Sequence, residues 1–344
     1  MTEPWLGASW PRQGPVASVV RSWWQEGLLD GLELTLEHGF AAAPEPAWTA
    51  PLDQAAAAGR LVGHAVMPSP YTPPDAVHAA WLPRAAAVVA RHRPRWVTDH
   101  EGLSRARGWQ AAPLPLPHSV GLVRRVRDHL ARLADAFQLP TGLENLALAV
   151  SPDDALARPD LLFAMLEPDG VLLLDVHNLW CTAVNQGLDP HAYLARFPLH
   201  LVRQLHVAGG RADPDGFRRD THDGPVPDAV FDLVTSAIAS CPRLEAVVWE
   251  RLTEGPPDAL RAEIVRLRGL LGGHRAAAPA GATVPRSSPH DADGPDTDVD
   301  AFQAAVRAAD RAALERVAPG FVTDERAWRV MTEVTERWGR PAPT

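Results

Sequence analysis

The sequence predicts an α/β protein, a (β/α)8 TIM-type barrel with a linker and a short C-terminal helical extension. Eight short apolar runs occur between residues 5 and 250, and segments with helical periodicity separate them. Strands that alternate with helices form parallel sheets, and eight such strands close into a barrel. The alternation stops near residue 273. We therefore expect residues 1–273 to form the barrel, residues 274–299 a flexible linker and residues 300–344 a short helical tail.

The predicted strands are short, as barrel strands usually are. They cover residues 5–9, 31–36, 61–66, 95–99, 142–148, 170–175, 201–207 and 246–250. The clearest helix covers residues 120–137, in which Val126, Leu133 and Phe137 belong to one apolar stripe and arginines occupy the other face. This amphipathic pattern is typical of an outer barrel helix, because one face packs on the sheet while the other meets water.

The segment after the predicted barrel has two parts that differ in composition. Residues 274–299 are rich in Ala, Pro, Ser and Asp, a composition typical of linkers. Residues 300–317 and 325–338 then show helical periodicity. Two short helices bury little surface alone, so we expect them to dock on the barrel or on a partner.

Composition indicates a soluble, cytoplasmic protein. The chain has 46% apolar residues, no apolar run long enough to cross a membrane, and an N-terminus without the features of a signal peptide. Its two cysteines, Cys181 and Cys241, are too few for a disulfide framework. The net charge is -9 and the sequence has no lysine, which argues against nucleic-acid binding.

Metal-ligand residue types occur at the carboxyl ends of the last six predicted strands. Active sites of this fold are built at that end of the barrel, so these side chains should converge. The candidates, in chain order, are His64, Asp99, His100, Glu144, Asn145, Asp175, His177, Asn178, His206, Asp220, His222 and Glu250.

Ordinary structural roles could explain some of these residues one at a time. Asp175 could cap a helix, and Glu250 could pair with Arg203 or Arg251. However, Glu144 and Asp175 stand in or directly after apolar runs, where a carboxylate is costly unless it is paired or bound to a metal. One shared metal centre is the more economical interpretation.

The ligand types narrow the choice of metal. Imidazoles and carboxylates without thiolates suit iron, manganese or zinc. The candidates are too numerous for one ion, so we expect two or three ions bridged by a carboxylate such as Glu144. Residue chemistry alone leaves open both an oxygen-using iron site and a hydrolytic zinc or manganese site.

Several segments together resemble a known family. GLENLA, DVHNLWCTAVNQGLDP, QLHVAGG, DTHDGPVPDAVFDL and VVWER occur in the order and spacing of the multinuclear non-haem iron-dependent oxidative enzymes, the family of the methanobactin biosynthesis oxidase. The similarity extends over residues 6–271. It implies a (β/α)8 barrel that holds two or three iron ions.

The resemblance also implies ligands, substrate and partners. The iron ligands would be His64, His100, Glu144, Asp175, Asn178, His206, Asp220, His222 and Glu250. Dioxygen would be the co-substrate, and the substrate would be a ribosomally synthesised precursor peptide, modified at cysteine. A separate protein would bind the leader part of that peptide. No further catalytic residue is assigned.

Two positions depart from the family pattern. The family often has a second histidine where this chain has Gly210, and an acid where it has Leu252. Two other functions therefore remain open: a zinc- or manganese-dependent hydrolase or sugar isomerase on the same type of barrel, and a non-catalytic peptide-maturation subunit.

Overall fold

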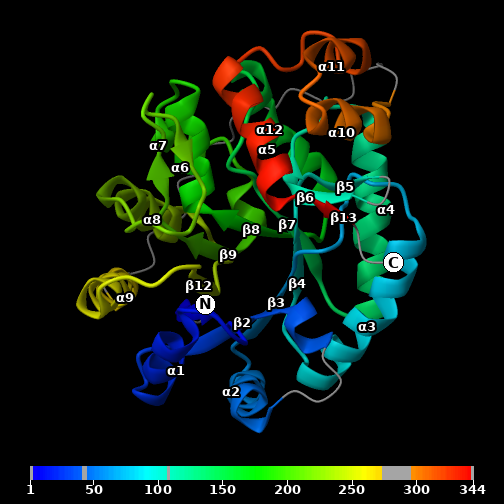
Figure 1. Ribbon diagram of the computed structural model, residues 1–344. Coiled ribbons are helices and arrows are strands. Elements are labelled where there is room, and N and C mark those ends of the chain that lie inside the picture. The colour runs from blue at the N-terminus through cyan, green and yellow to red at the C-terminus, as the bar shows by residue number, and fades with distance from the viewer. Residues whose placement is uncertain (1–2, 41–44, 107–108, 273–295, 342–344) are drawn as a thin grey trace.

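The computed structural model describes residues 3–40, 45–106, 109–272 and 296–341 and contains the predicted closed barrel (Figure 1). Eight parallel strands form it in the order β1-β12-β9-β8-β7-β4-β3-β2. They are β1 (Trp5–Ser9), β2 (Gly31–Thr35), β3 (Leu61–Ala65), β4 (Val97–His100), β7 (Thr141–Glu144), β8 (Val171–Asp175), β9 (Val202–Val207) and β12 (Ala246–Trp249).

Helices cover the outside of the barrel. They are α1 (Ala17–Gln25), α2 (Pro46–Ala57), α3 (Ala76–His92), α4 (Val120–Phe137), α5 (Pro152–Leu166), α6 (Val176–Asn185), α7 (Pro190–Leu194), α8 (Asp228–Ser240) and α9 (Pro257–Gly272), with short 3-10 turns at Leu36–Phe40 and Leu199–Leu201. Helix α4 has the predicted bounds. Its start is capped by the Ser119 hydroxyl, which accepts from the amide of Leu122, and its end is marked by Gln138 at φ 55°. None of the helices in the described ranges is both long and apolar enough to cross a membrane.

Predicted strand ends were wrong by a few residues, most clearly at residues 142–148. Strand β7 ends at Glu144, because Asn145 leaves the strand ladder and bonds to neighbouring backbone with its side chain. The Asn145 amide nitrogen donates to the carbonyl of Asp175 over 3.1 Å, and its amide oxygen accepts from the Asp175 N–H over 2.8 Å. Strand β4 begins at Val97 instead of residue 95 and includes His100.

Two short hairpins, absent from the sequence prediction, extend the carboxyl-terminal end of the barrel. Strands β5 (Leu103–Ala106) and β6 (Trp109–Leu114) follow β4, and β6 also pairs with β13 (Arg340–Pro341). Strands β10 (Arg211–Ala212) and β11 (Arg218–Arg219) follow β9.

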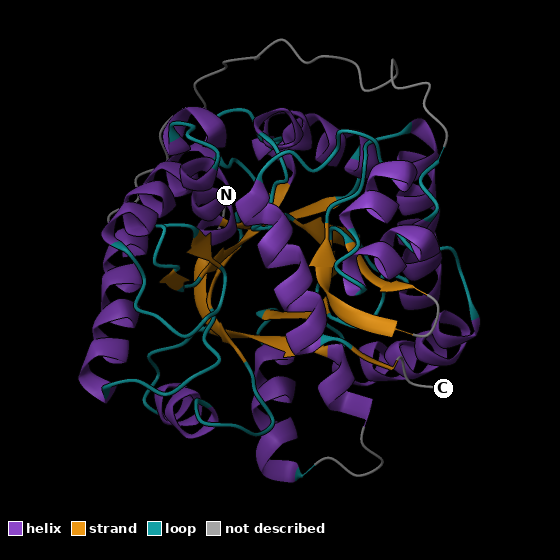
Figure 2. Cartoon of the chain, turned by 45° about the horizontal axis from the view of Figure 1, so that its top comes forward, coloured by secondary structure: helices purple, strands orange, loops and turns teal. Residues whose placement is uncertain are grey.

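The tail docks on the barrel, which is one of the two arrangements expected from the sequence (Figures 1 and 2). It forms three helices, α10 (Val299–Arg307), α11 (Arg311–Val317) and α12 (Glu325–Trp338). The single helix predicted over residues 300–317 was wrong: Ala309 at φ 52° breaks it, and Asp310 caps a new helix. Phe302 and Met331 are fully buried in the same apolar core as the barrel residues.

The predicted linker lies mostly outside the described residues. Of residues 274–299, only 296–299 are described. There the Asp296 carboxylate accepts from the Ser119 hydroxyl over 2.8 Å at the start of α4. The division into barrel, linker and tail stays a prediction.

Candidate metal centre

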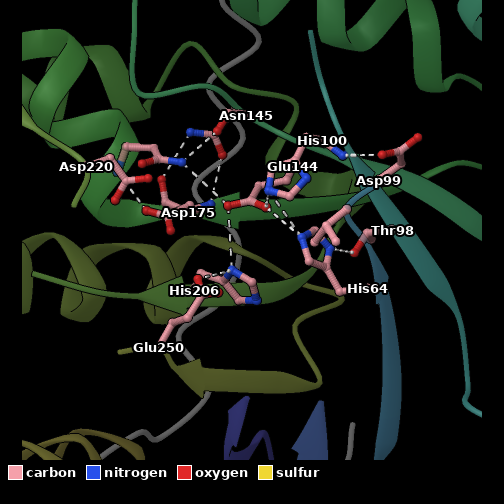
Figure 3. A network of polar contacts seen from close by, with 12 residues as sticks. His64, Thr98, Asp99, His100, Glu144, Asn145, Asp175, His206, Asp220 and Glu250 are labelled. Atoms are coloured by element: carbon pink, nitrogen blue, oxygen red, sulfur yellow. Dashed lines mark hydrogen bonds and ion pairs between the residues drawn. The ribbon is translucent and has the colours of Figure 1, made fainter. Parts of the chain in front are cut away.

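All nine residues proposed as ligands lie in one cluster at the carboxyl ends of the barrel strands, and Figure 3 labels all of them except Asn178 and His222. Five of them end or nearly end strands β3, β4, β7, β8 and β9, and Asn178 lies in the first turn of α6. The cluster consists of His64, His100, Glu144, Asp175, Asn178, His206, Asp220, His222 and Glu250.

Glu144 lies at the middle of the cluster (Figure 3). Its Oε2 is 3.3 Å from Nε2 of His64 and 3.5 Å from Nε2 of His100. Its Oε1 is 3.5 Å from Nδ1 of His206 and accepts from the Asn178 side chain over 3.5 Å. Glu144 therefore faces side chains from three other strands and one helix.

Glu250 joins the second half of the cluster. Its Oε2 lies 3.2 Å from Nδ1 of His206 and 3.4 Å from Nδ1 of His222. The other imidazole nitrogen of His222 is 2.7 Å from Oδ1 of Asp220. These last two residues lie on the loop after β11 and are partly exposed, so this half of the cluster meets the solvent at the mouth of the barrel.

The ligand atoms of the cluster lie close enough together to hold metal ions. Four groups of three donors each have ligand atoms within 4.8 Å of one another: His64, His100 and Glu144; Glu33, His206 and Glu250; Glu144, Asp175 and His206; Asp175, His222 and Glu250. The groups share three carboxylates and one imidazole. Shared carboxylates are what a cluster of bridged ions requires.

Unpartnered polar atoms support the same interpretation. Two buried side-chain atoms in the cluster, Asp175 Oδ2 and Asn178 Oδ1, have no hydrogen-bond partner among the described residues. Buried polar atoms are rarely left unsatisfied. Because both belong to the same cluster of nitrogen and oxygen donors, bound cations would satisfy them.

Burial disfavours charge on several groups of the cluster, although the neighbouring carboxylates hold the pKa of His206 and His222 above the usual value. Burial raises the pKa of Glu144 to about 8, and burial together with the charge of Asp220 raises the pKa of Asp175 to about 6. Burial and the neighbouring His64 lower the pKa of His100 to about 3. These last three shifts report the cost of a charge in this enclosed space. A cation coordinated by these carboxylates would offset that cost.

Glu33 on β2 is the main site residue that the sequence analysis missed. Its side chain is 1% exposed, and its Oε2 is 2.8 Å from Nε2 of His206. It thereby orients the histidine so that Nδ1 faces Glu144 and Glu250, as carboxylates often orient metal-binding imidazoles. The sequence did contain a signal for Glu33, because it is an acid within the apolar run GLELT. The same reasoning selected Glu144.

Thr98 has a similar role for His64. Its hydroxyl lies 3.0 Å from Nδ1 of that imidazole, while Nε2 faces Glu144. Both histidines thus have one nitrogen held by the protein and one directed into the cluster.

Three strand-end candidates lie beside the cluster. Asp99 points away from it, and its Oδ2 is 2.9 Å from Nε2 of His129 on α4. Asn145 holds the backbone before α6, as described above. His177 lies at the edge, with Nδ1 3.2 Å from Oδ1 of Asp220. The buried thiol of Cys181 contacts the same imidazole, its Sγ 3.6 Å from Nε2.

The two departures from the family pattern have clear structural settings. A Cβ at Gly210 would lie 2.1 Å from the carbonyl oxygen of Arg219 and 3.0 Å from Cε1 of His177, so the loop permits only glycine as it is built. Leu252 is 57% exposed, and its amide donates to the carbonyl of His222 over 2.9 Å. Neither position adds a ligand.

Solved structures similar to this chain share its fold. A xylose isomerase domain protein from Planctomyces limnophilus is 15% identical, with a TM-score of 0.51, and the match covers 78% of this chain and 98% of that one. An IOLI protein with a bound zinc atom is 11% identical, with a TM-score of 0.52, covering 79% of this chain and 100% of that one. At such identities the likeness concerns the barrel alone.

Sequence relatives and a family model give the family. A UPF0276 protein of Caulobacter vibrioides (strain NA1000 / CB15N) is 34% identical over 194 residues, 55% of this chain and 69% of that protein. One from Pseudomonas aeruginosa (strain PAO1) is 34% identical over 184 residues, 53% of this chain and 64% of that protein. The model of the RiPP precursor modification enzymes MbnB/TglH/ChrH matches residues 19–271. The match includes all nine clustered residues, and the chain belongs to this family of RiPP precursor modification enzymes.

Proposed function

We propose that this protein is a multinuclear iron-dependent oxidase that uses dioxygen to modify a ribosomally synthesised precursor peptide at a cysteine. The main support for several ions is that the four donor groups share carboxylates. A single ion could bind only some of these buried groups and would leave the other charges without a counter-charge. Family membership supports a precursor peptide as the substrate. The resemblance of the ligand segments to the multinuclear non-haem iron enzymes supports iron, dioxygen and the cysteine target.

Two or three iron ions would be held by the nine clustered residues. Iron bound there would supply the one-electron chemistry with dioxygen that side chains lack. The donors fit this assignment because they are imidazole nitrogens and carboxylate or amide oxygens, a set that accepts iron. The thiol of Cys181 is fully buried against His177, burial holds its pKa well above the usual value, and it belongs to none of the four donor groups.

The side chains of this protein have three roles in the proposed reaction. Glu144, Asp175 and Glu250 provide the negative charge that several cations need in a small volume. Glu33 and Thr98 fix the ring orientations of His206 and His64. The partly exposed donors His100, Asp220, His222 and Glu250 lie where a peptide side chain can approach from the solvent.

The proposal extends to the partner and compartment. A separate protein would bind the leader part of the precursor peptide, and the reaction would take place in the cytoplasm. A reducing compartment is consistent with Cys181 and Cys241, which are both free thiols.

The test is metal analysis combined with an oxygen-consumption assay. Protein purified without oxygen should contain more than one iron per chain. It should consume dioxygen only when the precursor peptide encoded beside its gene is present, and mass spectrometry should locate the change at a cysteine. Stoichiometric zinc or manganese with no iron-dependent turnover would favour the hydrolase or isomerase. Metal without any turnover would favour a non-catalytic maturation subunit.

A further inference from the structure

The tail helix α12 crosses the mouth of the barrel and contacts loops from several strands. In Figure 2 it lies in front of the ring of strands, on the side where the candidate metal centre opens. Just before it, the amides of Thr323 and Asp324 donate to the carbonyl of Val150, in the loop after β7. The Arg326 guanidinium donates to the carbonyl of Asn185 at the end of α6 over 3.0 Å. The tail lies beyond residues 19–271, which the family model matches.

Helix α12 makes its ion pairs to the barrel with the β10–β11 hairpin and the loop within it. Glu333 pairs with Arg219, the last residue of β11. Arg329 donates to Oδ2 of Asp213 over 3.1 Å and to Oδ2 of Asp215 over 2.9 Å. Arg219 also pairs with Asp213, through Nε at 2.9 Å. The hairpin and the helix are therefore joined by one network of five charged residues.

The same hairpin is held from the other side by α6. The Asn185 side chain donates to the carbonyl of Arg218 over 2.9 Å and accepts from its amide over 2.7 Å. Arg326 both contacts the Asn185 backbone and lies over the Phe217 ring, with 5.4 Å from Cζ to the ring centroid. Helices α6 and α12 therefore hold the hairpin from two sides.

Strand β11 of this hairpin leads directly to two residues of the metal centre. Asp220 follows Arg219, and His222 comes two residues later. His222 has φ 51°, a backbone conformation that side-chain-bearing residues adopt only when surrounding structure holds them there. A loop in that conformation depends on how firmly its ends are fixed.

From these contacts we infer that α12 positions one part of the metal centre. Glu333 and Arg329 hold the hairpin, and the hairpin fixes Asp220 and His222. His222 belongs to the group of Asp175, His222 and Glu250, and Asp220 lies against its other imidazole nitrogen. Arg219, Arg329 and Glu333 are positioning residues. The group of His64, His100 and Glu144, on β3, β4 and β7, does not depend on this contact. The inference rests on the proposed metal centre but not on the identity of the metal.

The test compares Fe²⁺ binding by full-length variants under anaerobic conditions. The double variant Glu333→Gln/Arg329→Gln removes the ion pairs while keeping side-chain size. It should bind one ion about tenfold more weakly and leave the others unchanged, since exposed ion pairs contribute modestly and several act together here. Glu336→Gln is the control for the Glu333 change: it removes the same charge on the same helix, at an exposed side chain for which no ion pair is found among the described residues.

A double-mutant cycle separates positioning from a general loss of structure. With His222→Ala already present, Glu333→Gln/Arg329→Gln should cause no further loss of binding, because the affected ion has already lost its ligand. Equal affinities of the double variant and the wild type would overturn the inference, as would an additive loss in the His222→Ala background. If the wild type binds Zn²⁺ and not Fe²⁺, the proposed function fails, but the same comparison with Zn²⁺ still decides the positioning role.

Discussion

The Glu144 carboxylate contacts imidazoles from three strands, and this gives it a role that no other ligand candidate shares. His64 and His100 approach one of its oxygens, and His206 approaches the other. His222, by contrast, lies at the rim beside Glu250 and Asp220. A central carboxylate and a peripheral imidazole should therefore respond differently to substitution.

Glu144→Gln should lose most of the bound iron and all oxidation, because it removes a negative charge shared by two donor groups. His222→Ala should keep part of the iron while losing most turnover. Both variants should stay folded, since neither leaves a large apolar cavity. Iron content and thermal unfolding, measured on the same samples, check this. Glu245→Gln is the control, an acid at the opposite end of the barrel that pairs with Arg203. Full iron and normal turnover in Glu144→Gln would contradict a centre built on this residue.

Metal binding should strengthen as the pH rises. Burial raises the pKa of Glu144 from 4.5 to about 8, so this carboxyl is protonated in the metal-free protein at neutral pH. A raised carboxyl pKa stabilises the metal-free fold below pH 4.5, and that contribution disappears as the pH rises to about 8. A cation must displace this proton, and also those of His206 and His222, whose pKa values the neighbouring carboxylates raise, so apparent affinity should rise at least about tenfold per pH unit between pH 6 and 8. Anaerobic Fe²⁺ titrations across this range check the slope, which Glu144→Gln should flatten.

At the scale of elements, the barrel strands could be predicted because each is a short apolar run between amphipathic helices. The hairpin β5–β6 could not. Its strands LSRA and WQAAPL contain no β-branched residue, and β6 includes a proline, so residue preferences do not mark them as strands. The tail was predicted as helical for the same reason as α4, from a stripe of apolar residues. Its packing on the hairpin depends on contacts between distant segments, such as the Gln303 amide and the carbonyl of Trp109.

A chain that ends at Gly273 should still form the barrel, because all eight barrel strands and their covering helices precede that residue. It should melt at a lower temperature and bind more of a hydrophobic dye, since α10 no longer packs on β5 and α12 no longer packs on β6. Circular dichroism melts and dye fluorescence measure both effects. Full-length Phe302→Asp, which should detach the tail without deleting it, is the companion variant. An unfolded truncated chain would show that the tail is an obligatory part of the core.

Across the whole molecule, the fold class and most of the residues that meet at the metal centre could be predicted from the sequence. Parallel barrel strands place their carboxyl ends at one rim, so ligand residue types at strand ends must converge once the barrel closes. His64, His100, Glu144, Asp175 and His206 could be selected in this way, and Asp220, His222 and Glu250 follow from the loops after the last strands.

The tertiary structure alone decided how these side chains face one another. Alternation along a strand sends neighbours to opposite sides, so Asp99 meets His129 outside the barrel while His100 enters the cluster. It also decided that Glu33, from a strand distant in sequence, orients His206, and that α12 reaches the hairpin before Asp220. Such contacts join residues far apart in the chain. Their geometry depends on barrel closure and on helix docking, which a local sequence pattern does not encode.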